Sequence, residues 1–405
     1  MEFNLQDAAS FAEKLDALVA NPDLVLQLED DVLRRRLREA GRKLSRAMES
    51  AGDTTHRLNN TTLELALARV GVEKGIFSIF ASHAVAMTNA ELSKKTQADP
   101  VLMKRLLRYY QSQEMISQLG DDSYRANYIT KAPTTLIGES GTGYFFEMIH
   151  PSFVAIPQFL RENGYKNPSD PNHAPWHLGH KTEMNPFPWL KAHPEYMKFF
   201  LPWMATMREG QPSFLDGMDF RKEILSSLQN TDNTIPVFVD VGGAMGHQCI
   251  ALQHKYPDFK GRIILQDQPF IIDQVKTSPL PGFQGIEAMA YDFFTPQPIK
   301  GASAYYLSCI LHDWPDHKCE EILKNLKGAM KTGSSYLLVD EIVFPERGAA
   351  WRATNLDISM MTCLAAWERT AAQWTTLLEK AGFKIQNIWE YAPESHNCLV
   401  IAVPQ

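Results

Sequence analysis

Several features that are typical of other classes of protein are scarce or missing in this sequence. The chain has five cysteines, and no two of them form a C-x-x-C pair. We therefore expect reduced thiols in a reducing compartment, without a disulfide or zinc framework. No apolar run reaches about 18 residues, so no membrane-spanning helix is predicted. The first residues are acidic and amphipathic, which does not match a secretory signal, and a cytoplasmic protein is predicted.

Positive charge is also in short supply, because the formal net charge is −7. A duplex nucleic acid needs a positive field, and it is not expected as a partner. The main basic cluster, residues 34–43, lies in an amphipathic helical pattern and is interpreted as a solvated helix face. The chain has no Gly-Lys-Ser or Gly-Lys-Thr, so a P-loop is excluded.

The first third of the chain is predicted to be helical. Within residues 1–60, leucines recur at helical spacing, with charged residues between them. These are Leu26, Leu33, Leu37 and Leu44. Such an apolar stripe must be buried, and a partner subunit is a reasonable place for it.

Residues 61–131 are predicted to form helices followed by a hairpin. Thr88 and Glu91 have the spacing of a capping box, and Asp99-Pro100 is typical of a helix start. A Gly-Asp-Asp-Ser turn at 120–123 then lies between two alternating segments, which predicts a β-hairpin. Helices plus a hairpin suggest a winged-helix shape, used here for packing because the basic surface of a DNA-binding protein is missing. Residues 1–131 are thus predicted to form one domain.

Residues 132–230 are rich in Pro, Trp, Phe and His and are predicted to be a helical connector. The aromatic side chains are explained either by an interdomain core or by the wall of an apolar substrate pocket. The two interpretations are compatible.

Residues 231–405 alternate predicted strands with predicted helices. Strands are expected at 235–243, 261–267, 303–311, 334–343 and 396–403, and helices at 246–255, 316–331 and 370–381. The first strand is a near-continuous apolar run, as in a strand buried on both faces. Alternation of this kind predicts an α/β domain with a doubly wound sheet covered by helices.

A glycine-rich turn closes the first of these strands. Asp240 is followed by Gly242, Gly243 and Gly246, and glycines at a strand-to-helix turn let the backbone approach a ligand closely. Asp267 ends the second strand, where an acid can hydrogen-bond ribose hydroxyls. The spacing departs from the dinucleotide fingerprint G-x-G-x-x-G, so adenosine without phosphates fits better. A plain tight turn beside an exposed acid is the alternative.

Further candidates follow at later strand ends. Asp292 and Phe293 could contact an adenine by hydrogen bonding and stacking. His312 closes a fourth strand, where ligands of open α/β sheets bind, and it is either a general base or a structural histidine. Glu341 and Glu368 could hold its imidazole in one tautomer, although exposed surface acids are the simpler interpretation of each.

Taken together, these motifs resemble one known family, the S-adenosylmethionine-dependent O-methyltransferases of the caffeic acid type, in their fungal secondary-metabolism branch. The resemblance extends from about residue 45 to the end of the chain. It includes the segments ALARVGVEKGIF, FLRENGYKNPSD, DVGGAMGHQ, LQDQP, AYYLSCILHDWPD and WERTAAQWTTLLEKAGF.

The resemblance implies a Rossmann-like S-adenosylmethionine-binding domain and an N-terminal helical, winged-helix dimerisation domain, so a homodimer is expected. It implies methylation of a hydroxyl on a small aromatic or polyketide-type molecule, with no metal. His312 would be the general base, oriented by Glu341 and Glu368. The implied cofactor contacts are Asp240, Gly242, Gly243, Gly246, Asp267, Asp292, Phe293 and Ser308.

Three positions depart from the family pattern. Ala244 replaces a third consecutive glycine, and Ser308 stands where Arg or Lys is usual beside the cofactor. Trp367 replaces a small or polar residue and is expected to crowd the pocket.

A second function is implied by the same resemblance. Some fungal members act as pericyclases that bind S-adenosylmethionine without consuming it, and they carry a histidine at the position of His150. Those members replace the His312 base with Arg or Lys, so its presence here favours methyl transfer. Beside His150, the substrate is expected to contact Phe146, Trp189, Asp313 and Met361.

Overall fold

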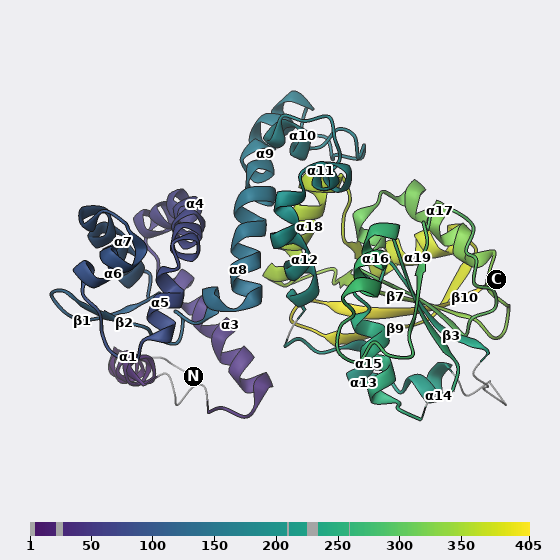
Figure 1. Cartoon of the computed structure of the whole chain (residues 1–405), viewed down its shortest axis with the longest axis horizontal. Coiled ribbons are helices and arrows are strands. Elements are labelled where there is room, and N and C mark those ends of the chain that lie inside the picture. Colours follow the sequence, from purple (N-terminus) through teal and green to yellow (C-terminus); the bar gives the residue numbers. More distant parts are fainter. Residues whose placement is uncertain (1–4, 22–26, 209, 225–233, 259) are drawn as a thin grey trace. The chain divides into compact units, whose positions relative to one another are not determined.

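The computed structural model describes residues 5–21, 27–208, 210–224, 234–258 and 260–405. Contacts divide the chain into two compact units, residues 1–142 and residues 143–405 (Figure 1). Leu26, one of the predicted stripe leucines, lies outside the described residues. Within these ranges, no helix has both the length and the apolar character that crossing a membrane requires.

The first unit is mainly helical. Its elements are α1 (Leu5–Ala20), α3 (Asp31–Ala47), α4 (Ala51–Glu73), α5 (Ile76–Ser82), α6 (Asn89–Thr96), α7 (Pro100–Ser112), β1 (Ser117–Gly120), β2 (Ser123–Arg125), η1 (Ala132–Thr134) and α8 (Leu136–Gly143), which ends at the boundary. The predicted capping box of Thr88 and Glu91 is confirmed at the start of α6, and Asp99 caps α7 ahead of Pro100. The hairpin is confirmed as the antiparallel pair β1 and β2.

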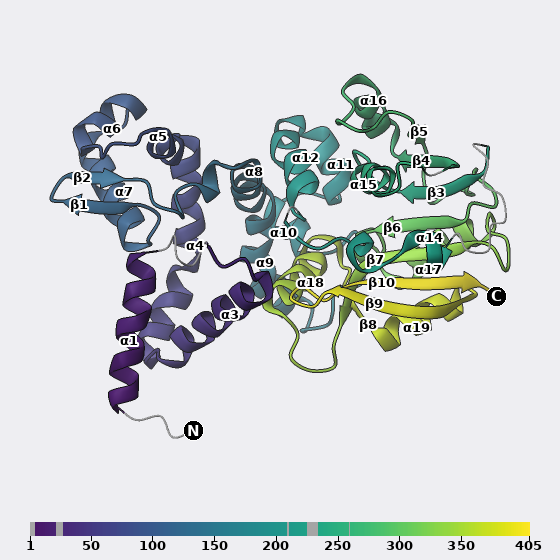
Figure 2. The same ribbon diagram turned by 90° about the horizontal axis from the view of Figure 1, so that it is seen from below.

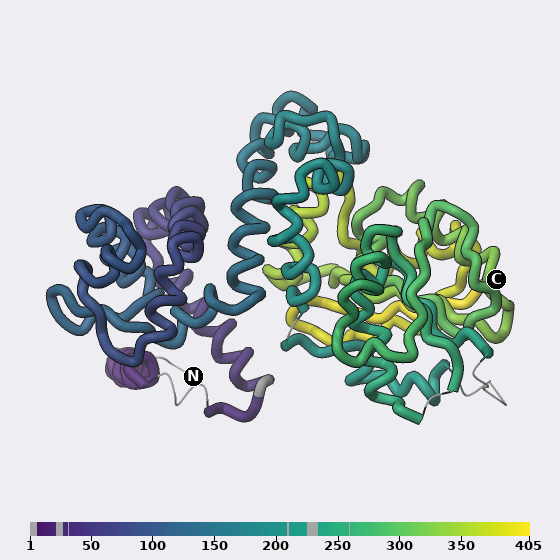
Figure 3. The backbone as a smooth tube through the Cα atoms, in the orientation of Figure 1, coloured from purple at the N-terminus to yellow at the C-terminus, as the bar shows by residue number. Residues whose placement is uncertain are grey.

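The second unit begins with helices that pack with the sheet domain. They are η2 (Tyr144–Ile149), α9 (His150–Glu162), α10 (Pro175–His180), α11 (Pro186–Ala192), η3 (Pro194–Tyr196), α12 (Met197–Thr206), α13 (Phe214–Gly217) and α14 (Phe220–Ile224). Both α9 and α10 contact α18 (Trp351–Leu364), about 200 residues later in the chain (Figure 3). Residues from 143 onward therefore belong to the same unit as the sheet, because their aromatic side chains share a core with α18.

The sheet has the order β5-β4-β3-β6-β7-β10-β9, with β8 paired to β7. Its strands are β3 (Pro236–Val241), β4 (Arg262–Asp267), β5 (Glu287–Ala290), β6 (Ala304–Ser308), β7 (Tyr336–Phe344), β8 (Arg369–Thr370), β9 (Phe383–Ala392) and β10 (Asn397–Pro404). The strands from β3 to β7 run parallel, whereas β10 runs antiparallel to both β7 and β9. The predicted α/β fold is confirmed, β5 is the strand expected to end before Asp292, and the mixed strand direction and the strand β9 are additional findings.

Helices cover both faces of this sheet, as the alternation of strand side chains requires. On β3, Val239 and Val241 face one core and Phe238 faces the other. The first core includes α17 (Asp316–Lys327) and α19 (Ala371–Lys380), and the second includes α15 (His247–Lys255) and α16 (Pro269–Thr277). Figure 2 shows α15 and α16 beside β3 and β4, with α19 beside β8 and β9.

Candidate active site

The parallel strands β3 to β7 end at one edge of the sheet, where ligands of open α/β folds bind. The glycine-rich turn lies there after β3. Gly242 has φ of +76° and Gly246 has φ of +82°, a backbone region that favours glycine. A Cβ on Gly243 would lie 2.4 Å from the Asp240 carboxylate, so this position has no room for a side chain.

Ala244 adopts the left-handed conformation with φ of +49°. A residue with a Cβ is strained there by about 1–2 kcal/mol, which explains why a glycine is usual at this position in the family that the sequence resembles. The Ala244 N–H donates to Asp267 Oδ2 at 2.8 Å. Ala244 thus links the turn after β3 to the acid at the end of β4.

The two acids of this region lie in different surroundings. Asp240 is 1% exposed, and its Oδ1 has no hydrogen-bond partner among the described residues. Burial raises the pKa of Asp240 to about 7. Asp267 is partly exposed and accepts N–H bonds from Ala244 and Gln268, while burial raises its pKa. A buried polar atom without a partner is expensive, so Asp240 Oδ1 fits a site that a polar ligand completes.

Asp292 and Phe293 follow β5 at the same edge. Asp292 is exposed, and its Oδ1 accepts the Phe294 N–H at 3.0 Å. Phe293 is half-buried and packs edge-on against Phe294 and Trp314. Its ring edge also comes within 4.0 Å of the Cβ position of Gly242, so the structure brings Phe293 to the glycine-rich turn.

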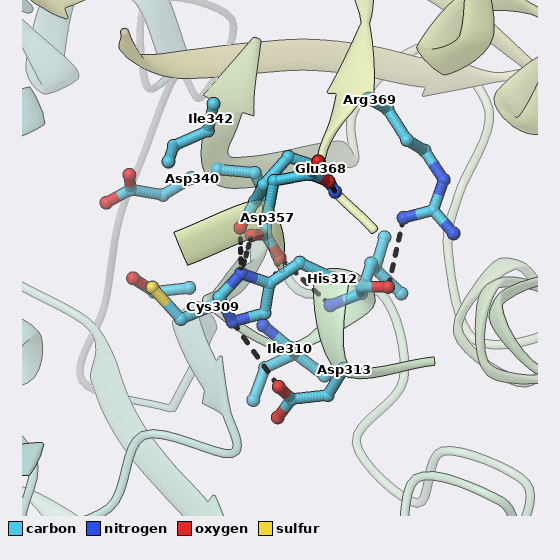
Figure 4. Close-up of polar contacts among 12 residues, drawn as sticks. Cys309, Ile310, His312, Asp313, Asp340, Ile342, Asp357, Glu368 and Arg369 are labelled. Atoms are coloured by element: carbon cyan, nitrogen blue, oxygen red, sulfur yellow. Dashed lines mark hydrogen bonds and ion pairs between the residues drawn. The ribbon is translucent and has the colours of Figure 1, made fainter. Parts of the chain in front are cut away.

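His312 lies in a short 3-10 turn, η4 (Leu311–Asp313), directly after β6. The residue is 5% exposed. Its Nδ1 donates to Glu368 Oε1 at 2.6 Å, because a carboxylate can only accept (Figure 4). Nε2 lies 3.5 Å from Asp313 Oδ1 on the opposite side of the ring. The neutral imidazole thus carries its proton on Nδ1 and leaves Nε2 as a base.

Glu341 lies within β7, next to Asp340, which pairs with the last residue of β6, and it connects β7 to this turn. Its Oε1 accepts the N–H groups of Ile310 and Leu311, each at 2.9 Å, and its Oε2 lies 3.6 Å from His312 Nδ1. Oε2 of Glu341 and Oε2 of Glu368 are buried without hydrogen-bond partners among the described residues. The structure therefore brings His312, Glu341 and Glu368 together from three separate parts of the chain.

The electrostatics of this cluster favour a charged imidazole. Burial disfavours the imidazolium, but the carboxylates of Glu368, Glu341 and Asp313 outweigh burial and raise the pKa of His312 well above its usual value. Burial raises the pKa of Glu341 to about 7 and that of Asp313 to about 6, in spite of the imidazolium. The carboxylates around His312 thus stabilise the imidazolium relative to the neutral imidazole.

Cys309 joins the cluster without having been predicted. Its sulfur, a nitrogen of His312 and an oxygen of Glu341 lie within 4.8 Å of one another, which is the spacing of possible metal ligands. His312 Nδ1 and Glu341 Oε1 already make hydrogen bonds, so we interpret the group as a hydrogen-bonded cluster. Sequence spacing showed no such set, because the three residues are spread over more than 30 positions.

Arg369 supports the turn that carries His312, a role that was not predicted from its sequence context. Its buried guanidinium donates to the carbonyl groups of Leu311 and Trp314 and to Asp316 Oδ1. Trp367 packs over the same guanidinium, with 5.4 Å between Cζ and the ring centroid. The unusual tryptophan therefore has a packing role beside Arg369.

Arg208 is a second residue that sequence analysis missed. Its guanidinium donates to Ser308 Oγ at 3.2 Å, to Asp340 Oδ2 at 3.1 Å and to Cys309 Sγ at 3.0 Å. A cation therefore lies beside Ser308, the position where the family pattern has its own Arg or Lys.

The predicted substrate contacts lie on several separate elements. Asp313 is next to His312, and Met361 is half-buried on α18, which packs against η4. His150 begins α9 and stacks on Phe146 of the π-helical segment η2, with ring centroids 6.1 Å apart. π-Helical turns are frequent at functional sites. Trp189 is 7% exposed and packs against other aromatic rings, as expected for a core residue.

Comparisons with known proteins identify the family and the fold. Residues 196–384 match the family model of the O-methyltransferase domain. Methyltransferase cfoC of Aspergillus candidus is 37% identical over 369 residues, which cover 91% of this chain and 90% of that protein. The solved structure of LepI in complex with SAM superimposes with a TM-score of 0.89 at 34% identity, covering 97% of this chain and 100% of that one.

A further solved structure, described as a pericyclic reaction enzyme, gives the same TM-score of 0.89 at 34% identity and covers 96% of this chain and 100% of that one. The sequence similarity over nearly the whole length and the shared fold lead to one conclusion. The chain belongs to the S-adenosylmethionine-dependent O-methyltransferase family, together with relatives from fungal secondary metabolism.

Proposed function

We propose that this enzyme methylates a hydroxyl group of a small aromatic or polyketide-type metabolite, with His312 as general base. The observation that carries the proposal is the hydrogen bond of 2.6 Å from His312 Nδ1 to Glu368, which directs the basic Nε2 away from the carboxylate pair. An oriented imidazole is the usual means of taking a proton from an attacking hydroxyl. Most of the rate then comes from holding two reactants together in a dry site.

The residues at the sheet edge fit the cofactor. Gly242 and Gly243 leave the backbone open for the methionine portion, Asp267 offers a carboxylate to the ribose, and Phe293 offers a ring face to the adenine. The unpartnered Oδ1 of Asp240 supports the same assignment. S-adenosylmethionine, when bound, supplies an electrophilic methyl group on a sulfonium. The protein residues orient the acceptor, exclude water and accept its proton at Nε2 of His312.

Turnover on a panel of fungal phenols, enols and pyridone alcohols tests the reaction. Purified protein with S-adenosylmethionine is expected to add about 14 mass units to one acceptor and to release an equal amount of S-adenosylhomocysteine. Both products are followed by mass spectrometry. Conversion of an acceptor without S-adenosylhomocysteine would contradict methyl transfer.

A second candidate function is a pericyclic or dehydration reaction in which the cofactor stays unconsumed. The raised pKa of His312 favours it, because an imidazolium is a strong hydrogen-bond donor to a reacting carbonyl or leaving hydroxyl. The 34% identity to a protein described as a pericyclic reaction enzyme is further support. His150, stacked on Phe146, is the residue to substitute if this function is found.

The pH dependence of turnover separates the two functions. A general base must be neutral, so methyl transfer should rise with pH through the raised pKa of His312. Glu368→Gln removes the carboxylate that raises this pKa most, so the acidic limb of the profile should move to lower pH. The plateau rate should fall about 10-fold as the imidazole is held less firmly.

The matched control is Glu321→Gln, which alters an acid on the surface of α17 that pairs with Lys318, and it should leave the profile unchanged. A rate that falls as pH rises would instead indicate an imidazolium donor.

We further propose that the first unit is a winged-helix-like dimerisation domain and that the enzyme works as a cytoplasmic homodimer. Exposed apolar side chains on α1 and α3 support a partner surface. They are Phe11, Leu15, Leu18, Leu33 and Leu37. The free state of all five cysteines is consistent with a reducing compartment. Sedimentation equilibrium of the full chain tests the dimer.

A further inference from the structure

Arg208 follows α12 and brings a positive charge to the carboxyl end of β6 and to Asp340, which is level with it on β7. Its Nη1 lies 3.2 Å from Ser308 Oγ and 3.1 Å from Asp340 Oδ2, and its Nη2 lies 3.0 Å from Cys309 Sγ. A quarter of the arginine side chain is exposed, whereas Asp340 is 1% exposed. The guanidinium is therefore held against the sheet by its hydrogen bonds, while the arginine side chain as a whole keeps some contact with solvent.

Asp340 does not depend on Arg208 for its hydrogen bonds. Its Oδ1 accepts the Tyr391 hydroxyl at 2.6 Å, and its Oδ2 accepts the Tyr306 hydroxyl. Figure 4 shows the Asp340 carboxylate pointing away from His312, on the side of Cys309. The need of the buried Asp340 for hydrogen-bond donors therefore does not by itself explain the presence of Arg208.

The register of the sheet locates this cation relative to the glycine-rich turn. Asp240 of β3 pairs with Tyr306 of β6. Beyond this pairing, the Cβ position of Gly242 meets the side chain of Ile310, and Arg208 is bonded to Ser308 and Cys309, the two residues before Ile310. Arg208 thus holds the segment that contacts the turn after β3 and that leads into the His312 cluster, which Cys309 joins.

The Arg208 guanidinium also has N–H groups that are not used in the hydrogen bonds described above. Nη1 serves three acceptors and Nη2 one, so Nε–H and one Nη2–H have no acceptor in the part of the chain that the structure describes. Two such N–H groups are the donors that bind a carboxylate in a bidentate manner. The buried Asp340 holds the pKa of Arg208 well above its ordinary value, so the group stays charged.

We propose that Arg208 binds the α-carboxylate of the amino-acid portion of S-adenosylmethionine. It thereby supplies, from α12, the cation that is missing at Ser308. This inference rests on the proposed role of the glycine-rich turn in cofactor binding. A purely structural arginine, which ties α12 to the sheet through Asp340, is the competing explanation.

Calorimetric binding to the full chain distinguishes the two explanations without turnover. The probes are S-adenosylhomocysteine and its decarboxylated form, which keeps the adenosine, the sulfur and the amino group. Arg208→Met should weaken the binding of S-adenosylhomocysteine about 10- to 100-fold, which is the usual effect of losing charge-assisted hydrogen bonds. It should change the affinity of the decarboxylated probe less than about 3-fold, and Arg208→Lys should recover part of the loss.

The matched control is Arg221→Met, because Arg221 pairs with the exposed Asp258 on the surface. It should alter neither affinity. Equal weakening of both probes by Arg208→Met would overturn the proposal in favour of the structural role, and an unchanged affinity for S-adenosylhomocysteine would overturn it outright.

The unsubstituted protein provides an independent measurement if the methionine variant does not fold. It should bind S-adenosylhomocysteine about 10-fold or more tightly than the decarboxylated probe, and Arg208→Lys should narrow that difference. Equal affinities for the two probes would overturn the role of Arg208. Failure to bind either probe would instead refute cofactor binding itself, on which the proposal rests.

Discussion

His312→Ala is expected to lower methyl transfer about 10²- to 10⁴-fold, which is the usual contribution of a positioned general base. The substitution removes the imidazole. In this cluster, Nδ1 of the imidazole faces the Glu368 and Glu341 carboxylates, which leaves Nε2 to accept a proton. Single-turnover measurements with saturating S-adenosylmethionine would follow the chemical step directly.

The binding of S-adenosylhomocysteine is the first control for this variant. His312 is bonded to Glu368, whereas the proposed cofactor residues lie on the turn after β3, so the affinity should change less than about 3-fold. His317→Ala, which removes an exposed histidine five residues later, should leave turnover unchanged. Full turnover by His312→Ala would remove this residue from the base role.

Arg369→Met is expected to reduce the free energy of unfolding by about 3–5 kcal/mol, as is typical when one partner of a buried, hydrogen-bonded charge is removed. Arg369 is 1% exposed, and its guanidinium lies over the rings of Trp367 and Trp374. Its loss leaves the carbonyl groups of Leu311 and Trp314 without their strongest donor. Urea unfolding followed by tryptophan fluorescence measures the effect.

Turnover should also fall in Arg369→Met at temperatures where the variant is folded, because Leu311 and Trp314 flank His312. Arg369→Lys keeps the charge but not the planar fork, so an intermediate loss is expected. Arg262→Met provides the contrast, since Arg262 pairs with the exposed Glu287 and such surface pairs contribute about 0–1 kcal/mol. Equal stability losses at positions 369 and 262 would contradict the proposed support of the turn.

Much of the fold was predictable because local patterns and the final packing agree. The apolar runs of β3, β4, β6, β7 and β10 are buried on both faces, and each was expected as a strand. β5 was expected only as a strand end before Asp292, without bounds, because it has four residues, of which Glu287 and Ala290 are exposed. β9 was missed because its half-exposed, partly polar pattern is ambiguous between a strand and a helix.

The antiparallel direction of β10 could not be predicted either. Its sequence is as apolar as that of a parallel strand, and only its connection to β9 determines the direction. The same limit applies to the predicted connector at 132–230. Its aromatic residues identify a buried surface but not that α18, from the end of the chain, completes it.

The sequence by itself determined which residue types stand at the strand ends, and therefore the family, the cofactor class and the set His312, Glu341 and Glu368. Those assignments depend only on neighbouring residues, because a strand that is followed by a glycine-rich turn or by an acid can be recognised in the sequence itself.

Tertiary structure alone decided what surrounds those residues. Arg208 reaches Ser308 and Asp340 across 100 and 132 positions, and Arg369 reaches Leu311 across 58. The charge on His312 likewise depends on burial and on three carboxylates, of which only Asp313 is its neighbour in sequence. Hydrogen bonds and Coulomb interactions depend on distance in space, which the path of the whole chain sets.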